Sequence, residues 1–466
     1  MSIDSLNIPQ IEAPFGEATV REPMAFSAVP SQRDAPGEFA EQRPYRPIAE
    51  PFIPGNPYRR PLDRTRLASI DWTRAVTEGR FVSDESLMAH RFLMNVYESD
   101  ALFLPEAGMT AATAADYESF YSRRSRLLGE IARPLVEDHA LGFLADEVRT
   151  TGQWDVSSVE AHLTAAIDEA NQAVSLVVAR LQTAPEPRRA AELLIAQMAL
   201  DGLTEATAMS QNIGGAFGPE QSELFKIFID EFGYGVFGAK HSTLFVEMCR
   251  SVGMATDSHH YWFFYLPSSI AVNNYFYLVT RNRTGFFRYV GAMAYLEATF
   301  ATWFRQLSSA LRGIYGEAVD TRYCDEHAHI DQHHGRMAVH DLVLPLVAKH
   351  GTVAAREVIR GVEEIRLLGA LGDADLLAQL DWEPQLDQNC EPMGPIQHLA
   401  AGDPFDTRVA DATTVCAVRS GHLELHWRPT GEPLRIEAGY GVRIPAGRLY
   451  GLRCESEATY TLSGTR

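Results

Sequence analysis

The sequence has few cysteines, a deficit of positive charge and no long apolar run. Its five cysteines are scattered without a CxxC pair, so neither a disulfide framework nor a thiolate zinc site is expected. Lysine and arginine total 41 against 61 aspartate and glutamate residues, which gives a formal net charge of -20. A chain this acidic repels phosphate backbones and anionic lipid surfaces, so nucleic acids and membranes are not expected as partners. A small-molecule partner is favoured.

Targeting and membrane-spanning patterns are also missing. The first residues, Met1–Gln10, contain neither a basic stretch nor an apolar run, so we expect no secretory signal and a cytoplasmic location. The longest apolar stretch, Tyr261–Val272, is interrupted by Pro267 and is shorter than the roughly 20 residues of a membrane helix. We expect it to form a buried, aromatic-rich helix.

The pattern of the 466 residues changes along the chain and predicts several domains. Eleven of the 25 prolines lie in residues 1–62, which show no sustained periodicity and are expected to form an extended arm. Apolar residues at helical spacing predict a helical domain over 63–150. Long helical segments separated by glycine or proline predict a bundle over 151–386. Short alternating runs divided by glycines predict a small β domain over 387–466.

One histidine-rich segment has the residue types of a metal site. On a helix at about 100° per residue, His327, Asp331 and His334 fall on one face about 60° wide. Two imidazoles and one carboxylate are ligands suited to iron, manganese or zinc. The alternative is a solvated polar helix face. His329 and His333 point the other way and are expected to lie at the surface or to support the ligands from outside.

Three carboxylates in apolar helical stretches are further candidates, because a buried metal pair needs negative charge around it. They are Glu205, Glu231 and Glu297, and an exposed or locally hydrogen-bonded glutamate is an equal alternative for each one alone. His241 follows Glu231 by ten residues, and the glycines between them favour a kink that would bring it to the same site. With Asp331, four carboxylates would balance two divalent irons. The spacing differs from the Glu-x-x-His repeats of ferritin-like bundles, so a different helical scaffold is required.

Four segments of the sequence are long or specific enough to compare with known families: Asn56–Arg60, Ile229–Phe245, Asn273–Phe276 and Glu326–Met337. They resemble the N-nitrosourea synthase family of streptozotocin biosynthesis, and the likeness runs from about Asn56 to the C-terminus. The resemblance implies a multidomain, mainly α-helical protein. Its parts would be an N-terminal helical domain that forms a homodimer, a haem-oxygenase-like helical bundle and a C-terminal cupin, which is a β-sandwich. The resemblance also implies that seven residues ligate two irons: Glu205, Glu231, His241, Glu297, His327, Asp331 and His334.

The family's chemistry supplies the expected function. Its di-iron site uses O2 to hydroxylate guanidine nitrogens of an N-methylated arginine, and its mono-iron cupin rearranges the product to an N-nitrosourea. The resemblance therefore implies two Fe(II) ions per chain, O2 as co-substrate, an external electron donor and an amino-acid substrate. Because all seven ligand positions are filled, we expect a non-haem di-iron monooxygenase that acts as an N-hydroxylase in natural-product biosynthesis.

The predicted cupin departs from the family pattern at its three metal ligands. Arg408 and Ala410 stand where two histidines are expected, and Tyr450 stands where the third is expected. We therefore expect no cupin-catalysed rearrangement. His422 and His426 are not expected to replace these ligands, because their face of the strand has the pattern of the solvent-facing side of a sandwich.

Several alternatives stay open at this point. The same di-iron site would serve oxidation of another amine to an oxime, nitroso or nitro product, or oxidative C–C cleavage or desaturation. Full N-nitrosourea synthesis would need cupin ligands other than the three missing ones. A non-catalytic iron-binding partner is the alternative of a different class, and the complete ligand set argues against it. Arg281, Arg283 and Arg288 are candidates for binding a substrate carboxylate, with a surface role equally open.

Overall fold

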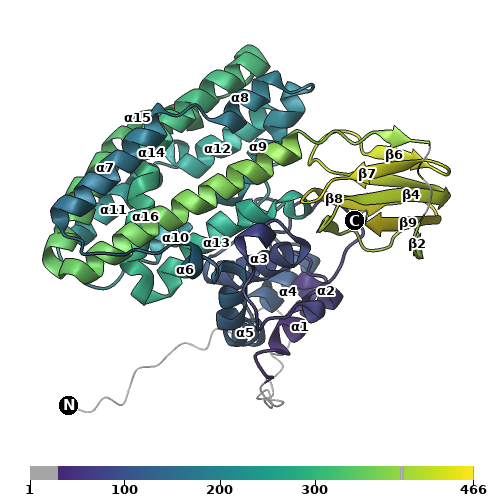
Figure 1. The fold of residues 1–466 in the computed structure, drawn as a ribbon, viewed down its shortest axis with the longest axis horizontal. Coiled ribbons are helices and arrows are strands. Elements are labelled where there is room, and N and C mark those ends of the chain that lie inside the picture. Colours follow the sequence, from purple (N-terminus) through teal and green to yellow (C-terminus); the bar gives the residue numbers. More distant parts are fainter. Residues whose placement is uncertain (1–29, 389, 391–392, 465–466) are drawn as a thin grey trace, which may run out of the picture.

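The computed structural model describes residues 30–388, 390 and 393–464 of the chain. The helices lie between residues 35 and 380, and the strands begin at Leu386. Figure 1 shows the long helices gathered in a bundle, a group of shorter helices below it and the β part at one side. The chain is therefore multidomain and mainly α-helical, with a C-terminal β-sandwich, as the sequence predicts.

The N-terminal helices start where side chains satisfy free backbone N–H groups. The carboxylate of Asp63 accepts hydrogen bonds from the first turn of α2, and the hydroxyl of Ser83 accepts one from the first turn of α3. α3 is buried along most of its length and packs between α5 and the bundle helix α13. The helices of this group are α1 (Ala35–Ala40), α2 (Arg64–Ser69), α3 (Asp84–Tyr97), α4 (Ala111–Phe120), α5 (Arg123–Leu141) and α6 (Leu144–Glu147).

Residues 30–62, for which the prolines predict an extended arm, are packed against these helices. Tyr45, Tyr58 and Arg60 are fully buried, and α1 lies within the segment. The aromatic anchors between the prolines bury enough apolar surface to hold the segment in place, although it has little regular structure. The prediction of an extended arm is therefore wrong for this segment, and residues 1–29 lie outside the described residues.

The bundle is built around α14, and α15 and α16 pack along it. Glycines allow close approach at both contacts: a Cβ on Gly291 would lie 2.1 Å from the Val358 carbonyl oxygen, and one on Gly335 would lie 2.5 Å from Ala298 Cα. Any side chain at these two positions would push the helices apart. The bundle helices are α7 (Val156–Gln172), α8 (Leu176–Thr183), α9 (Pro187–Gly202), α10 (Thr207–Ser210), α11 (Glu220–Glu231), α12 (His241–Ser251), α13 (Pro267–Arg281), α14 (Phe286–Tyr315), α15 (Arg322–Met337) and α16 (Leu344–Leu380), with a break in α16 at Gly351.

The apolar stretch Tyr261–Val272 is largely buried, but it is not one helix. A single 3-10 turn covers Trp262–Phe264, and α13 begins only at Pro267. Proline disfavours a helical conformation in the residue before it, and Leu266 is accordingly extended, with φ -72° and ψ 148°. Among the described helices, none combines the length and the apolar character needed to cross a membrane.

The β part is a sandwich of two antiparallel sheets with its own apolar core. The strand orders are β1-β7-β4-β9-β2 and β3-β8-β5-β6. Leu423 and Leu425 of β5 are fully buried in this core, and His422 and His426 lie on the other face. The strands are β1 (Leu386–Asp387), β2 (Ile396–Leu399), β3 (Thr407–Val409), β4 (Thr414–Ser420), β5 (His422–His426), β6 (Leu434–Glu437), β7 (Gly441–Ile444), β8 (Leu449–Arg453) and β9 (Ala458–Gly464).

The outer face of β5 is covered at its His426 end. His426 is buried, and its ring lies 5.2 Å from the ring of Phe405. Phe405 in turn contacts Phe263 of the aromatic stretch, at 5.1 Å between ring centroids. His422 and Glu424 on the same face are half-buried. The alternation along β5 follows the prediction, but the prediction of a solvent-facing side is wrong at His426, because Phe405 packs on it.

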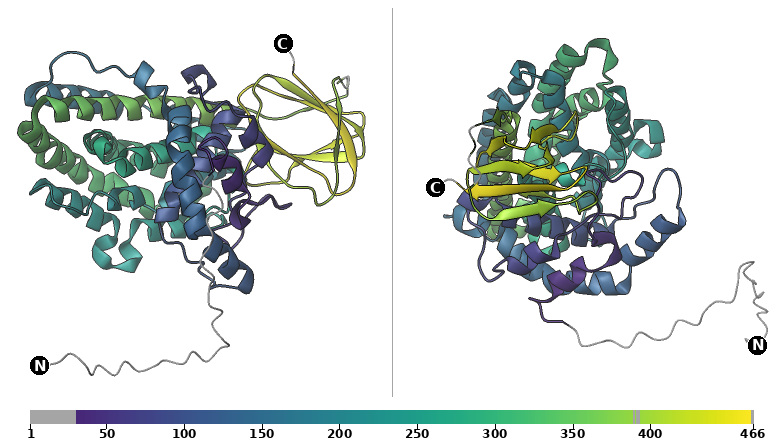
Figure 2. Two further views of the ribbon diagram at one scale, coloured as in Figure 1. Left: turned by 90° about the horizontal axis from the view of Figure 1, so that it is seen from below. Right: turned by 90° about the vertical axis from the view of Figure 1, so that its right-hand side faces the viewer.

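Buried charges join the sandwich to the helical part. Arg66 pairs with Asp84 of α3 and with Asp406 of the sandwich. Arg91, also on α3, binds the same Asp406 and donates to the Thr407 hydroxyl. Figure 2 shows the sandwich against one end of the helical part, beside the N-terminal helices.

Candidate metal centre

Seven side chains from five parts of the bundle converge in its interior. Glu205 follows the end of α9, Glu231 ends α11, His241 begins α12 and Glu297 lies within α14. The fifth part is α15.

α15 presents three of the seven side chains on one face. His327, Asp331 and His334 are buried, as their helical spacing predicts, with 5%, 1% and 1% exposure. His329 and His333 are exposed on the other side of the helix. The helical spacing therefore places His327, Asp331 and His334 in the bundle interior and His329 and His333 at the surface.

A tight reversal of the chain places Glu231 and His241 side by side. Gly233, Tyr234 and Gly235 all have positive φ values, of 57°, 51° and 82°. A Cβ on Gly233 would lie 2.5 Å from the Ala239 carbonyl carbon, so only glycine fits at this point of the turn. Two 3-10 turns thus replace the kink that the glycines predict, and they return the chain to the start of α12.

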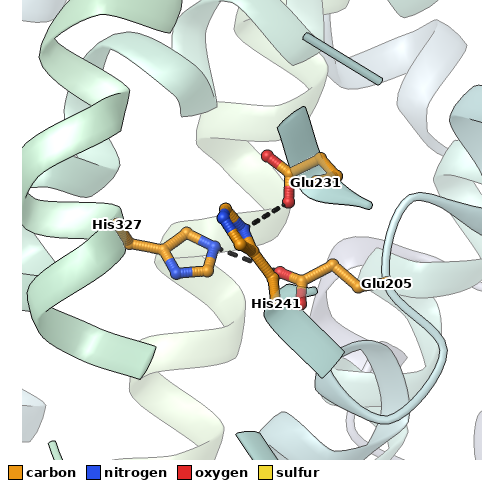
Figure 3. Close-up of side chains that lie close together, drawn as sticks. All are labelled: Glu205, Glu231, His241 and His327. Carbon is orange, nitrogen blue, oxygen red and sulfur yellow. Dashed lines mark hydrogen bonds and ion pairs between the residues drawn. The ribbon is translucent and has the colours of Figure 1, made fainter. Parts of the chain in front are cut away.

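Four of the side chains form a first group of candidate ligands: Glu205, Glu231, His241 and His327. One potential ligand atom from each lies within 4.8 Å of the others. His241 Nδ1 is 2.6 Å from Glu231 Oε2, and His327 Nε2 is 3.1 Å from Glu205 Oε1. Figure 3 shows the two imidazoles and the two carboxylates pointing toward one another.

A second group surrounds His334. Its Nδ1 atom lies 3.3 Å from Glu297 Oε2, 3.7 Å from Glu231 Oε1 and 3.8 Å from Asp331 Oδ1. Glu231 belongs to both groups, with one oxygen facing His241 and the other facing His334. A carboxylate in this position has the geometry to bridge two cations.

The charges of the cluster are unbalanced without a cation. Burial, together with the neighbouring Glu297, Glu231 and Glu205, raises the pKa of Asp331 to about 11. Burial works against protonation of His334, but its contacts with Glu297 and Glu231 outweigh burial and raise the pKa of His334 to about 9. The protein alone therefore holds protons here at neutral pH, and a divalent cation would displace them.

The pattern of unsatisfied atoms fits cations of this kind. Both carboxylate oxygens of Asp331, Oε2 of Glu205 and Nδ1 of His334 are buried without a hydrogen-bond partner among the described residues. Such atoms are costly unless something pairs with them. Imidazole nitrogen and carboxylate oxygen together form a donor set suited to iron. The residues present therefore fit two iron ions.

Two residues outside the predicted set orient the histidines. Asp230 Oδ2 lies 3.0 Å from His334 Nε2, and the backbone oxygen of Tyr323 lies 3.0 Å from His327 Nδ1. A partner on one ring nitrogen leaves the other nitrogen free for a metal. The sequence held a signal for both: Asp230 precedes Glu231, and Tyr323 lies one helical turn before His327.

The three arginines proposed to bind a substrate carboxylate are engaged elsewhere. Arg281 pairs with Glu130, Arg283 donates to a backbone oxygen, and Arg288 pairs with Glu357. None of the three lines the interior cavity described below. The structure therefore assigns them to contacts between helices.

A cavity of about 860 Å³ opens onto the cluster. Its walls come from α7–α11 and α13–α16 and include Phe276, Tyr289 and Trp303. Among the candidate ligands, Glu205, Glu231, Glu297, His327 and Asp331 line it. Its volume is in the range of small-molecule sites.

The three positions of the sandwich where the sequence departs from the family's metal ligands are occupied by Arg408, Ala410 and Tyr450. Arg408 and Tyr450 are paired residues on β3 and β8, and both Ala410 and Tyr450 are buried, at 4% and 6% exposure. Burial raises the pKa of Tyr450 to about 12, so its phenol stays neutral. Among the described residues, no group of three possible metal ligands is found in the sandwich.

Comparison with known proteins gives two matches. The sequence profile of a family described as iron-containing redox enzyme matches residues 192–370, a span that contains all seven converging side chains. A nitrosourea synthase from Streptomyces achromogenes subsp. streptozoticus is 38% identical over 440 residues. The alignment covers 91% of this chain and 93% of that protein.

Proposed function

Because this chain belongs to the family of the nitrosourea synthase, an oxidoreductase family with a haem-oxygenase-like iron domain, we propose that it is a di-iron, O2-dependent N-oxygenase. The proposed substrate nitrogen is a guanidine nitrogen of arginine or of a modified arginine. The proposed product is a hydroxylated guanidine, without rearrangement to an N-nitroso compound.

The observation that carries this proposal is the seven-residue cluster at the wall of the cavity. Glu205, Glu231, His241 and His327 would hold one iron. Glu297, Asp331 and His334 would hold the other. Four carboxylates balance the charge of two divalent ions, so no net charge is left buried.

Two ferrous ions in this cluster would supply electrons to O2 and allow oxygen transfer to a substrate nitrogen. The protein's own residues set the conditions for this chemistry. Asp230 and the Tyr323 backbone hold the ring orientations of His334 and His327. The Tyr323 hydroxyl donates to Glu205, and Phe276, Tyr289 and Trp303 supply aromatic walls to the cavity.

The altered sandwich supports release of the product before rearrangement. Arg408, Ala410 and Tyr450 offer no imidazole, and Tyr450 takes up space in the sandwich core. The sandwich instead contributes contacts to the helices, through Asp406 and Thr407.

The test is to load the full-length protein anaerobically with Fe(II), add arginine or N-methylarginine, admit O2 and follow the product mass and the iron content. We expect about two irons per chain from the donor set and a substrate mass raised by one or two oxygen atoms. His327→Ala should lose iron and product. His329→Ala, which changes an exposed histidine on the other face of α15, should keep both.

Each alternative gives a different result in the same experiment. Oxygen consumption without an oxygenated guanidine would redirect the proposal to another amine. An N-nitroso product, or a third iron per chain, would show that the sandwich is active and would contradict the proposed release of the product. Iron binding without oxygen consumption with any of the amines would leave a non-catalytic iron-binding protein.

A further inference from the structure

The interior cavity contains acidic groups that the metal cluster does not use. Seven carboxylate side chains line it, against one guanidinium, that of Arg366. Four of the seven belong to the cluster. Arg366 is paired with Glu169 at 2.7 Å and with Glu363 at 3.0 Å, so it neutralises no further acid. Asp201 and Asp373 are the two lining carboxylates that belong neither to the cluster nor to the ion pairs of Arg366.

The side chains of Asp201 and Asp373 have no hydrogen-bond or ion-pair partner within the described part of the chain. Both expose their carboxylates along the cavity, Asp201 from α9 and Asp373 from α16. Burial, with the charges of Glu231 and Glu297, raises the pKa of Asp201 to about 6. Burial also raises the pKa of Asp373. Both residues are exposed, and two carboxylates that line one concave site favour a cationic group of a bound small molecule there.

The positions of the two carboxylates differ. Asp201 precedes Glu205 by four residues and lies within the electrostatic reach of the cluster. Asp373 shares a face of α16 with Arg366, Gly369 and Ala370, since these residues recur at intervals of three and four. A Cβ on Gly369 would meet no atom within 4 Å, so this face of the helix leaves open space.

We propose that Asp201 and Asp373 recognise a substrate with two cationic groups, a guanidino amino acid whose guanidinium lies on Asp201 and whose α-ammonium lies on Asp373. This inference rests on the proposed function and adds to it the orientation of the substrate. With its guanidinium on Asp201, the substrate presents its terminal nitrogens to the metal cluster. With its ammonium on Asp373, it points the amino-acid end along α16. Planar guanidinium and carboxylate form paired, charge-assisted hydrogen bonds.

Equilibrium binding to the anaerobic, Fe(II)-loaded full-length protein tests this orientation, with titration calorimetry as the readout. The probes are arginine, agmatine and citrulline. Agmatine keeps both cations without the carboxylate, and citrulline carries a neutral urea in place of the guanidinium. We expect agmatine to bind and citrulline to bind at least about tenfold more weakly than arginine, because a charge-assisted bond is lost.

The variants assign each end of the substrate. Asp201→Asn should weaken arginine binding about tenfold or more and remove the preference for arginine over citrulline. Asp373→Asn should weaken the binding of both arginine and citrulline and leave the preference for arginine intact. Asp168→Asn, which changes an exposed acid of α7 that does not line the cavity, should bind like the unchanged protein. Iron content, measured on every sample, should not change in any of the three.

Equal binding of citrulline and arginine by the unchanged protein would overturn the proposal, whether or not the variants fold. Absence of binding by all three probes would also overturn it, as would an Asp201→Asn protein that holds its iron and keeps the preference for arginine. The outcome for the proposed function is separate. Loss of the preference in Asp201→Asn without an oxygenated product from the unchanged protein would support the inference and contradict the N-oxygenase. Product formation by the unchanged protein, together with unchanged binding by Asp201→Asn, would support the N-oxygenase and contradict the inference.

Discussion

The interiors of the bundle and the sandwich are built on opposite principles. The bundle gathers seven ionisable side chains in its interior, six of them buried, and several of their atoms have no hydrogen-bond partner among the described residues. The sandwich fills the corresponding space with Leu423, Leu425, Tyr450 and their apolar neighbours. An interior of the first kind is stable only when something neutralises it, whereas an interior of the second kind is stable by itself. The difference separates a candidate metal site in the bundle from an apolar core in the sandwich.

The largest effect should come from removing a candidate ligand of the bundle. We expect His334→Ala to reduce oxygenation at least about a hundredfold and to remove the stabilisation by the Fe(II) ion that His334 would hold, which should reach about 2.7 kcal/mol at a hundred times the dissociation constant of that ion. Anaerobic thermal unfolding with and without Fe(II) measures this. His333→Ala, at the neighbouring exposed position, should behave like the unchanged protein, and equal loss in both variants would contradict a ligand role for His334.

A cavity in the sandwich core should affect stability without affecting iron. Leu425 is fully buried, so Leu425→Ala should lower the free energy of unfolding by about 2–5 kcal/mol. Denaturant unfolding measures the loss, and iron content measured on the same samples below the transition should stay at the value of the unchanged protein. A drop in iron content would mean that the sandwich takes part in metal binding, which would break the comparison.

The support behind the ligands should have a smaller effect than the ligands themselves. Asp230→Asn keeps a hydrogen-bond partner for His334 but removes its charge, so the affinity for Fe(II) should fall about tenfold, at the low end for partners of ligating histidines. A competition titration with a chelator measures the change. An unchanged affinity would contradict a role for Asp230 in orienting His334.

The smallest expected effect is on the pH dependence of stability and comes from His90, a buried histidine in surroundings unlike those of His334. His334 sits among carboxylates, whereas burial and the neighbouring His139 lower the pKa of His90 to about 3. The unfolded chain binds a proton near pH 6.5 and folded His90 does not, so His90 makes the protein less stable as the pH falls below 6.5. At pH 5.5 this amounts to about 1.4 kcal/mol.

The variant His90→Phe tests the direction of this pH dependence of stability. The difference in unfolding free energy between pH 7.5 and pH 5.5 should shrink by about 1.4 kcal/mol in the variant, as measured with metal-free protein by urea unfolding. A difference that is the same in both proteins would show that His90 takes up a proton in the folded state.

The covered face of β5 and the packed segment 30–62 show where local patterns fail. Alternation along β5 places Leu423 and Leu425 inward correctly, but no local signal says that Phe405 covers the other face. The prolines of residues 30–62 rule out long helices, but they say nothing about burial of Tyr45 and Tyr58 between distant helices. In both cases the deciding contacts join residues far apart in the sequence.

The sequence by itself determined the divisions between helical and β regions and the face of α15 that carries His327, Asp331 and His334. These depend on spacing of two, three or four residues, which the backbone geometry of a strand or helix converts directly into a shared face. The sequence also supplied the residue types, and its likeness to a known family indicated seven candidate ligands.

Only the tertiary structure decided which of these groups meet. The crossing of α14 and α15 at Gly335, and the reversal at Gly233, bring Glu297 and His241 to the cluster. The same packing leaves the Asp201 side chain without a partner among the described residues and engages Arg281, Arg283 and Arg288 elsewhere. Whether a charged side chain is a ligand, a support or a free group depends on its neighbours in space, and helix packing sets those neighbours.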